Sequence, residues 1–438
     1  MRLRVIVSLG LVLSGARSAE ATYSIVACER ATRQCGVAVQ TDNLAVGASV
    51  PTVQAGVGAV ASQFETHPRH GARGLALLAQ GLSPEAVIRT LLAEDGGFEG
   101  RGPEARQIAV VGLDGISAVH TGEEAAAAAW AGSRSGPGFS VQGNGLAGPE
   151  VVEAMARAFV GSRGSLADRL LAALRAGDAA GGQRTGRQSA ALLVRTPEGF
   201  PLDVDLRVDD APDPVGALMR LHDLQAGRQQ IIAARLAGRR GDDADARALL
   251  AAGTARVHGW ARALVTAAEV ALELEAPDAA LRSLTAAFVR HPRRRLTALG
   301  SGTFAALGHV PSFHRWISPD LLARLDADTR AFARSTSMSS AARTALAARL
   351  LEAGRARPAL EVLDGDRRTD PDLSLLRARA LRALGRTGEA RDACRTGIAA
   401  APEDLRLRRL QAAIDRTGER TPDHGTTPAG APRAPTRR

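Results

Sequence analysis

Up to about residue 225 the chain alternates strand-like runs with pairs of helix-like runs. Alternating apolar and polar residues bounded by turn residues predict strands, whereas apolar residues at every third or fourth position predict helices. Asp114-Gly115, between two apolar runs, predicts a tight hairpin turn. Strands and helix pairs in separate blocks favour stacked layers over a doubly wound parallel sheet. The expected strands cover 22–28, 35–40, 57–64, 107–113, 116–121, 139–142, 188–195 and 202–208, and the expected helices cover 74–80, 149–160, 166–176 and 214–224, with one more beginning at Pro84 behind the N-cap Ser83.

From residue 226 to 415 the strand signals vanish, and Ala, Leu and Arg recur at helical spacing. Three stretches in this region, 276–281, 354–360 and 385–390, are similar to one another. They resemble tetratricopeptide-type helical hairpins, which stack and present a groove to a partner. Gly354 and Gly385 are 31 residues apart, against about 34 in that repeat. A generic Ala-rich helical bundle is the alternative.

The two ends of the chain differ from the rest. Arg2 and Arg4 precede the apolar run 5–13, and the segment ends in an Ala-x-Ala site at Ala21; together these predict a secretory signal over residues 1–21. The apolar run is well short of the ~20 residues that span a bilayer, so we expect no membrane span in the mature form. The tail 416–438 is rich in Pro, Thr, Arg and Gly, and we expect it to be disordered.

The signal segment offers more than one cleavage point. Cuts after Ala16 or after Ser18 also follow small residues, but only the cut after Ala21 places Thr22 at the amino terminus. A secretory signal predicts a periplasmic or secreted protein.

The three cysteines fit an oxidising compartment with one bonded pair and one spare thiol. Cys28 and Cys35 flank a short turn, and in a hairpin they would lie opposite each other within bridging distance. Two buried free thiols are the alternative. Neither of these cysteines nor Cys394 forms a Cys-x-x-Cys pair, so the cysteine spacing predicts no metal site.

The chain contains no lysine, so all 56 of its basic residues are arginine, and the formal net charge is +10. The abundance of Ala and Gly suggests codon bias rather than selection for a charged partner. The charge still allows attraction to anionic envelope polymers or lipids. A nucleic-acid-binding protein would show a basic stripe with interleaved aromatic residues, and because the sequence has none we expect no nucleic-acid partner.

An amino-terminal threonine would bring its own catalytic base. A hydroxyl is a poor nucleophile unless a base accepts its proton. The α-amino group has a pKa of about 7.7–8.0, so part of it is neutral at pH 7. Strand alternation places Ser24 on the same face as Thr22, where it can support the site as a hydrogen-bond donor. The alternative is that both residues merely begin an ordinary strand. Without lysine, an arginine or backbone N–H groups would have to stabilise the oxyanion.

Six ordered motifs between residues 22 and 224 resemble one bacterial family, the domain of unknown function 1028. The resemblance implies a place among the N-terminal nucleophile (Ntn) hydrolases. It implies an αββα four-layer fold over 22–225 and an amide-hydrolysing site. The all-α helical-repeat domain over 226–415 lies outside the resemblance, and we expect no cofactor and no metal. Members without a signal expose the matching threonine by losing the initiator methionine. The motifs are TYSIVA from Thr22, CGVAVQ from Cys35, GVGAVASQ ending at Gln63, SVQGN ending at Asn144, GPEV from Gly148 and GRQSA from Gly186.

Three of the matched positions are candidate site residues. Asn144 stands between two glycines, and its amide could donate to an oxyanion; a left-handed turn residue is the alternative. Gln63 follows a strand, where it could contact substrate or cap a backbone group. Arg106 could be the missing cation that contacts substrate, or one half of a structural ion pair.

Asp178 and the loop 181–189, which carries Arg187, form the strongest candidate site for binding an anionic substrate group. Gln183 stands in this loop where relatives usually have an aspartate, which weakens any role that needs a carboxylate there. His67 and His70 suggest a metal site, but we interpret them as part of a solvated loop.

These observations favour an exported Ntn-type hydrolase of amide bonds in a small molecule or peptide. Thr22 would be the nucleophile, and the helical domain would bind a protein partner or the substrate. The alternative is a non-catalytic scaffold with an Ntn-like fold that serves envelope binding or assembly.

Overall fold

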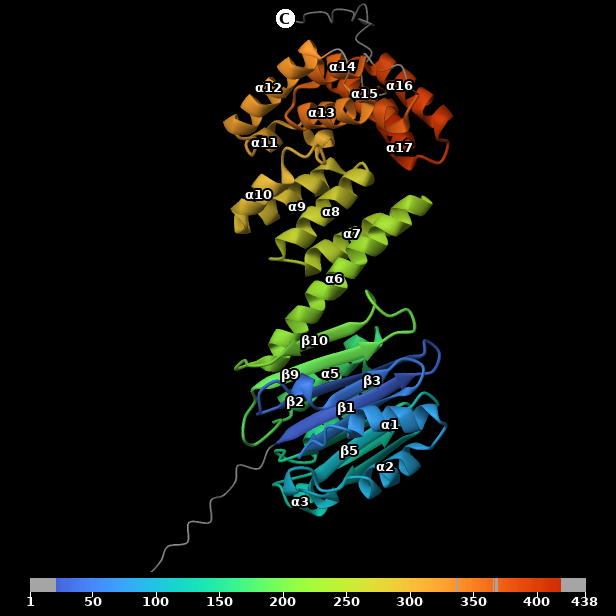
Figure 1. Ribbon diagram of the computed structural model, residues 1–438, viewed down its shortest axis with the longest axis vertical. Coiled ribbons are helices and arrows are strands. Elements are labelled where there is room, and N and C mark those ends of the chain that lie inside the picture. The colour runs from blue at the N-terminus through green and yellow to red at the C-terminus, as the bar shows by residue number, and fades with distance from the viewer. Residues whose placement is uncertain (1–20, 336–337, 365, 367–368, 419–438) are drawn as a thin grey trace, which may run out of the picture. The chain divides into compact units, whose positions relative to one another are not determined.

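The structure is a computed structural model that describes residues 21–418, except 336–337, 365 and 367–368 (Figure 1). The chain divides into two compact units between Asp223 and Leu224. The expected signal segment, apart from Ala21, lies outside the described residues, as does 419–438 of the expected tail; the residues 416–418 belong to a helix instead. Within the described ranges, no helix combines the length and apolar character needed to cross a membrane.

The first unit contains two antiparallel sheets. The larger sheet has the order β10-β9-β2-β1-β8-β7, so β1 lies near its centre. The smaller sheet has the order β3-β4-β5-β6. The strands are β1 Thr22–Glu29, β2 Gln34–Thr41, β3 Pro51–Gln54, β4 Gly58–Phe64, β5 Arg106–Gly112, β6 Ser117–Thr121, β7 Gly132–Gly136, β8 Phe139–Asn144, β9 Ser189–Arg195 and β10 Val204–Val208.

The two sheets pack face to face, and a helix pair covers the outer face of each. Val26, Val39 and Ala61 belong to the core between the sheets. Ile25 on β1 faces the opposite way and packs with the helices α4 and α5, because neighbouring residues of a strand point to opposite faces. Val60 on β4 packs in the same manner with α1 and α2. The layers are therefore helix, sheet, sheet and helix.

Local sequence signals fix the ends of these helices. The Ser83 side chain accepts the Ala86 N–H at the start of α2, and Ser165 with Asp168 forms a capping box on α5. The helices of this unit are α1 His70–Ala79, α2 Pro84–Ala93, α3 Glu123–Ala126, α4 Glu150–Gly161 and α5 Leu166–Ala179, with the 3₁₀ segments η1 Val46–Ala48, η2 Phe98–Gly100 and η3 Pro103–Ala105.

The described part of the second unit is helical. The mixed α+β class, with a two-sheet domain before a helical region, is as predicted from the sequence. The helix expected over 214–224 continues to Arg240, and Gly241, with φ 89°, follows its end. The helices are α6 Pro214–Arg240, α7 Asp243–Arg256, α8 Ala261–Glu273, α9 Pro277–Arg290, α10 Pro292–Ala298, η4 Ala305–Leu307, α11 Pro311–His314, α12 Pro319–Arg334, α13 Ser340–Glu352, α14 Ala356–Asp364, α15 Pro371–Ala383, α16 Thr387–Ala400 and α17 Leu405–Gly418.

One type of turn joins four helix pairs of this unit. In each turn a residue with positive φ follows the first helix, and the next N–H donates to the carbonyl five residues earlier, as in a Schellman end. The first two of these turns are centred on Gly241 and Glu275, 34 residues apart. The four bonds are Asp242 to Ala237 (3.0 Å), Ala276 to Ala271 (2.8 Å), Arg355 to Leu350 (2.8 Å) and Arg386 to Leu381 (2.9 Å).

Two neighbouring glycines test this description of the turn. Gly385 has φ 76° and no atom near its missing Cβ, so Gly385→Ala is expected to lower the stability of the helical unit by about 1 kcal/mol through backbone strain alone. Gly388 is equally open but lies inside α16, so Gly388→Ala is expected to be neutral or to stabilise by up to about 1 kcal/mol. Urea unfolding of both variants measures the difference. Effects of the same sign would contradict the assignment of Gly385 to a left-handed turn position.

Candidate active site

Buried polar side chains gather where β1 begins and β2 and β8 end. Thr22 pairs with Thr41 on one side and with Asn144 on the other. Burying a polar group costs free energy unless it is hydrogen-bonded, so a cluster of buried polar side chains is not expected in a hydrophobic core. It marks this end of the two sheets as the candidate site. The buried polar residues here are Thr22, Ser24, Gln40, Thr41, Ser62, Gln63, Gln107, Gln142, Asn144 and Gln183.

The backbone nitrogen and the hydroxyl of Thr22 both lie inside this polar cluster. The Thr22 nitrogen donates to Asn144 Oδ1 at 3.2 Å, and Thr22 Oγ1 lies 3.0 Å from Thr41 Oγ1. The Asn144 Nδ2 donates to Gln107 Oε1 at 2.9 Å. Asn144 therefore acts as the acceptor for the Thr22 nitrogen, and its own amide nitrogen points to Gln107. It ends strand β8, and Gly145 takes the left-handed position with φ 61°.

Gln63, on β4 of the smaller sheet, binds the backbone of Thr22, and Ser24, on β1, binds Gln63. Ser24 Oγ donates to Gln63 Oε1 at 2.6 Å. The Gln63 Nε2 then donates to the Thr22 carbonyl at 3.1 Å and to Gln107 Oε1 at 2.8 Å. Gln107 accepts from both Gln63 and Asn144, so each amide fixes the orientation of the next. Ser24 supports the site through Gln63.

Ala21, the residue before Thr22, is also part of this site and is fully buried. Its carbonyl oxygen accepts from Thr41 Oγ1 at 2.8 Å and from Gln183 Nε2, and its N–H donates to Asp42 Oδ1 at 3.2 Å. A hydroxyl has one proton. Because Thr41 donates its proton to Ala21, Thr22 must be the donor in the contact between the two threonine hydroxyls.

A chain of hydrogen bonds orients the Gln183 amide. The Tyr23 hydroxyl donates to Gln40 Oε1 at 2.6 Å, and Gln40 Nε2 donates to Gln183 Oε1 at 3.2 Å. Burial, reinforced by the charge of Asp178, raises the pKa of Tyr23 well above its ordinary value, so its hydroxyl stays a donor. This leaves the Gln183 nitrogen to face Ala21. Sequence reasoning missed Thr41 as a site residue and noticed Gln183 only as a departure from relatives.

Comparison with known proteins places the first unit in a family. The model of a family of unknown function (DUF1028) matches residues 22–218. A solved crystal structure of a Silicibacter pomeroyi protein, described with the same family, has 35% sequence identity; the match covers 46% of this chain and 84% of that chain, with a TM-score of 0.42. The chain belongs to this family. The membership predicted from the motifs is confirmed, and a search of curated proteins found no match.

Within this family domain, Arg106 lies in a buried ion pair. Its Nε and Nη2 bind the two oxygens of Asp95 at 2.8 and 3.1 Å, and its Nη1 donates to the Glu65 carbonyl at 2.7 Å. Both side chains are 1% exposed. Burial opposes ionisation of Asp95, but the hydrogen bonds from Arg106 and Gly97 outweigh it and hold the pKa of Asp95 below its usual value. All of these partners are internal, which favours the structural ion pair over a substrate contact for Arg106.

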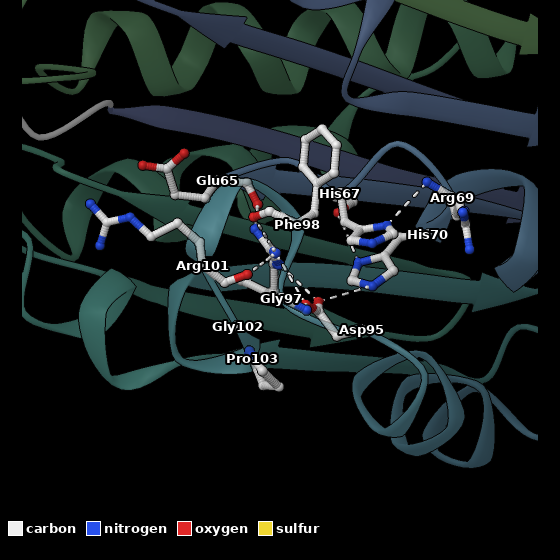
Figure 2. Close-up of polar contacts among 12 residues, drawn as sticks. Glu65, His67, Arg69, His70, Asp95, Gly97, Phe98, Arg101, Gly102 and Pro103 are labelled. Atoms are coloured by element: carbon white, nitrogen blue, oxygen red, sulfur yellow. Dashed lines mark hydrogen bonds and ion pairs between the residues drawn. The ribbon is translucent and has the colours of Figure 1, made fainter.

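His67 and His70 lie beside this ion pair (Figure 2). Their rings stack with centroids 4.4 Å apart, and both residues are buried. The prediction of a solvated loop is wrong, because both histidines are buried, with Asp95 next to His70 and Phe98 packed against His67. His70 Nε2 lies 3.3 Å from Asp95 Oδ2, and its Nδ1 lies 3.5 Å from Ser62 Oγ. Among the residues that the structure describes, no group of three or more His, Cys, Asp or Glu could hold a metal ion.

The buried His70 predicts a stability that depends on pH. Burial lowers the pKa of His70 to about 4, helped by His67 and opposed by Asp95. The unfolded chain binds the proton with a pKa of about 6.5. The contribution of neutral His70 is therefore complete above about pH 6.5 and is lost as the pH falls towards 4, by up to about 3 kcal/mol. Between pH 6.5 and 4, the unfolding free energy should therefore fall more steeply for wild type than for His70→Asn, and parallel pH curves would contradict a buried, neutral His70.

Asp178, before the loop 181–189, and Arg187, within this loop, form an ion pair at 2.7 Å. Asp178 lies at the end of α5, and Arg187 is about half exposed. The two opposite charges neutralise each other. Asp178 also influences the site, because its charge helps to raise the pKa of Tyr23.

Cys28 and Cys35 form a disulfide between β1 and β2, where they are direct partners in the strand register. Cys394 is a free, buried thiol in α16. The disulfide ties the far end of the hairpin whose other end carries Thr22 and Thr41.

Proposed function

We propose that the mature protein is an exported Ntn-type amidohydrolase with Thr22 as its amino-terminal nucleophile and the Thr22 α-amine as its base. The observation that carries this proposal is the placement of Thr22. Its nitrogen and its hydroxyl both lie in a buried polar cluster at the start of a central strand. The match to the family also begins at this residue.

The surroundings of the Thr22 nitrogen suit a general base. Its described hydrogen-bond partner is the neutral Asn144 amide. A neutral hydrogen-bond partner leaves the freed amine without a counter-charge in direct contact, which favours the neutral form that a base requires. The amine would take the hydroxyl proton as Oγ1 attacks the amide carbon, and would give it to the leaving amine when the C–N bond breaks. Water then hydrolyses the resulting ester.

The cut that frees Thr22 must come before folding. Ala21 is fully buried and Thr22 is 5% exposed, so a peptidase cannot reach the bond between them in the folded chain. Cleavage of the unfolded chain during export meets this requirement, which supports a periplasmic or secreted location. The facing sheets covered by two helix pairs support the Ntn-like fold that the family resemblance implies.

The helical unit would serve as the binding module. Four helix pairs share the same turn, and two of these turns are 34 residues apart, which supports a tetratricopeptide-like arrangement. Such stacked pairs present a surface to a peptide or protein. We propose that this unit recruits a partner or the substrate.

A non-catalytic scaffold is the second candidate, and Ala21 is the observation that favours it. While Ala21 remains attached, the Thr22 nitrogen is part of a peptide bond and cannot act as a base. Amino-terminal sequencing of the exported protein separates the two candidates. The hydrolase requires a chain that begins at Thr22, whereas a chain that begins at Arg17 or Ala19 supports the scaffold.

A further inference from the structure

We infer that the position of Ala21 is the acyl-group site of the mature enzyme, and that this site takes a small α-aminoacyl group with a free amine. The substrates would then be alanyl or glycyl amides. The inference rests on the proposed function, because it needs Thr22 as the nucleophile. Three groups of contacts around Ala21 carry it.

The first contacts hold a carbonyl oxygen. The Ala21 carbonyl accepts from the Thr41 hydroxyl and from the Gln183 amide. Two donors aimed at one carbonyl oxygen beside a nucleophile are the arrangement that stabilises the oxyanion of an acyl transfer. The chain through Tyr23 and Gln40 fixes the Gln183 donor in place, so the pair is preorganised.

The second contact holds a nitrogen. The Ala21 N–H donates to Asp42 Oδ1 at 3.2 Å. Within the described part of the chain, Asp42 makes no ion pair, so its charge is available to a ligand. A carboxylate binds an ammonium group more strongly than a peptide N–H, because both partners are then charged. This favours a substrate whose α-amine is free.

The third contact limits the size of the acyl group. Gly145 lies directly against Ala21: a Cβ added at Gly145 would be 2.6 Å from the Ala21 Cβ. Gly145 also has φ 61°, a conformation that favours glycine. With Ala21 fully buried, a larger acyl side chain would meet the backbone at Gly145. The site therefore fits hydrogen or methyl as the side chain.

The acyl group of a substrate would come close to the place that Ala21 occupies. In the uncleaved precursor, the acyl group of Ala21 is bonded to the Thr22 nitrogen. In the acyl-enzyme, the acyl group of the substrate would be bonded to Oγ1 of the same residue. In the reaction, Oγ1 bonds to the substrate carbonyl carbon, its proton passes through the Thr22 amine to the leaving amine, and the C–N bond breaks. Water then attacks the ester and releases the amino acid and the Thr22 hydroxyl. In the uncleaved chain, Ala21 itself occupies the proposed acyl-group site.

Four anilides test the inference on the mature protein: alanyl, leucyl, N-acetylalanyl and propionyl p-nitroanilide. We expect kcat/KM for the alanyl anilide to be at least tenfold higher than kcat/KM for each of the other three anilides. Asp42→Asn should lower it about 10- to 100-fold and leave the N-acetylalanyl anilide unaffected. Gln183→Glu should lower the rates for all four. Asp114→Asn, an equivalent change at the distant β5–β6 turn, is the control and should change none of them.

The outcomes separate this inference from the proposed function. In one outcome, the leucyl or propionyl anilide is hydrolysed as fast as the alanyl anilide, in a reaction that Thr22→Ala abolishes. This result would overturn the small aminoacyl site but would still support the proposed hydrolase. An Asp42→Asn variant with unchanged preference for the free amine overturns the role of Asp42. If no anilide is cleaved by a protein that begins at Thr22, the substrate class is wrong, and covalent labelling of Thr22 then decides the proposed function.

Discussion

Replacing Thr22 with alanine is expected to lower kcat/KM for an amide substrate of the mature protein by on the order of 10³-fold or more. The reason is that this change removes the attacking oxygen, and residues that act as a unit in nucleophilic catalysis cannot replace one another. Alanine keeps the backbone nitrogen bound to Asn144 and the strand register with Thr41, so folding should be preserved. Initial rates on an amide panel, with equal circular dichroism and unfolding midpoints, measure the effect.

Two further variants make this expectation specific. Thr22→Ser keeps both the hydroxyl and the amine, and should retain much of the activity. Thr41→Val removes the hydroxyl that contacts Thr22 Oγ1 while keeping the shape of the side chain, and should lower kcat more than it raises KM. Thr22→Ala protein that hydrolyses amides at the wild-type rate would exclude Thr22 as the nucleophile.

Removing Arg106 is expected to have the largest effect on stability. Arg106→Leu leaves the Asp95 carboxylate buried without its counter-charge, and leaves the carbonyls of Glu65 and Arg101 without a donor. Loss of one partner from a buried ion pair costs about 3–5 kcal/mol. Urea unfolding followed by Trp130, with Trp260 and Trp316 replaced by phenylalanine, reports the stability of the first unit separately.

A neighbouring ion pair provides the matched control. Arg73 binds Glu94 with the same two-bonded geometry, at 2.8 and 2.7 Å, but the two side chains are 40% and 47% exposed. Arg73→Leu should leave the unfolding midpoint almost unchanged, because water replaces the lost partner. Equal effects of the Arg73 and Arg106 variants would show that burial does not set the strength of these pairs.

Elements with a strong local pattern could be predicted from the sequence. The first hairpin follows from two apolar runs around a short polar turn, and its register pairs Cys28 with Cys35. The Asp114-Gly115 turn has the positive φ at Gly115 that such hairpins require. In contrast, β7 reads Gly-Ser-Arg-Ser-Gly and lies at a sheet edge with its middle residues exposed. It has no apolar alternation, so the sequence contains no signal for it.

The candidate site could be predicted only in part, for a physical reason. Thr22 and Asn144 stand in recognisable motifs, but their contact joins residues 122 positions apart. The roles of Thr41, Asp42 and Gln183 depend on the bond that each makes to Thr22 or Ala21, and these bonds exist only once β1, β2 and the loop 181–189 are assembled. Single polar residues at strand ends look the same whether they line a site or a solvated edge.

The same limit applies to the residues around Arg106. Asp95 lies in a glycine-rich loop that resembles an exposed turn, and the sequence does not show that this loop folds inward over His70. The burial that turns the Asp95–Arg106 contact into a strong ion pair arises from tertiary packing of β5 with the loops before it.

Covalent labelling of the exported protein tests the central claim most directly. An α′,β′-epoxyketone closes a ring with the hydroxyl and the amine of an amino-terminal threonine, so a stable adduct needs both groups free on one residue. We predict that mass spectrometry will find one inhibitor molecule on the reduced tryptic peptide from Thr22 to Arg30, and none on the Thr22→Ala protein. An exported chain that begins upstream of Thr22, or one that begins at Thr22 and gains no adduct, would contradict the account.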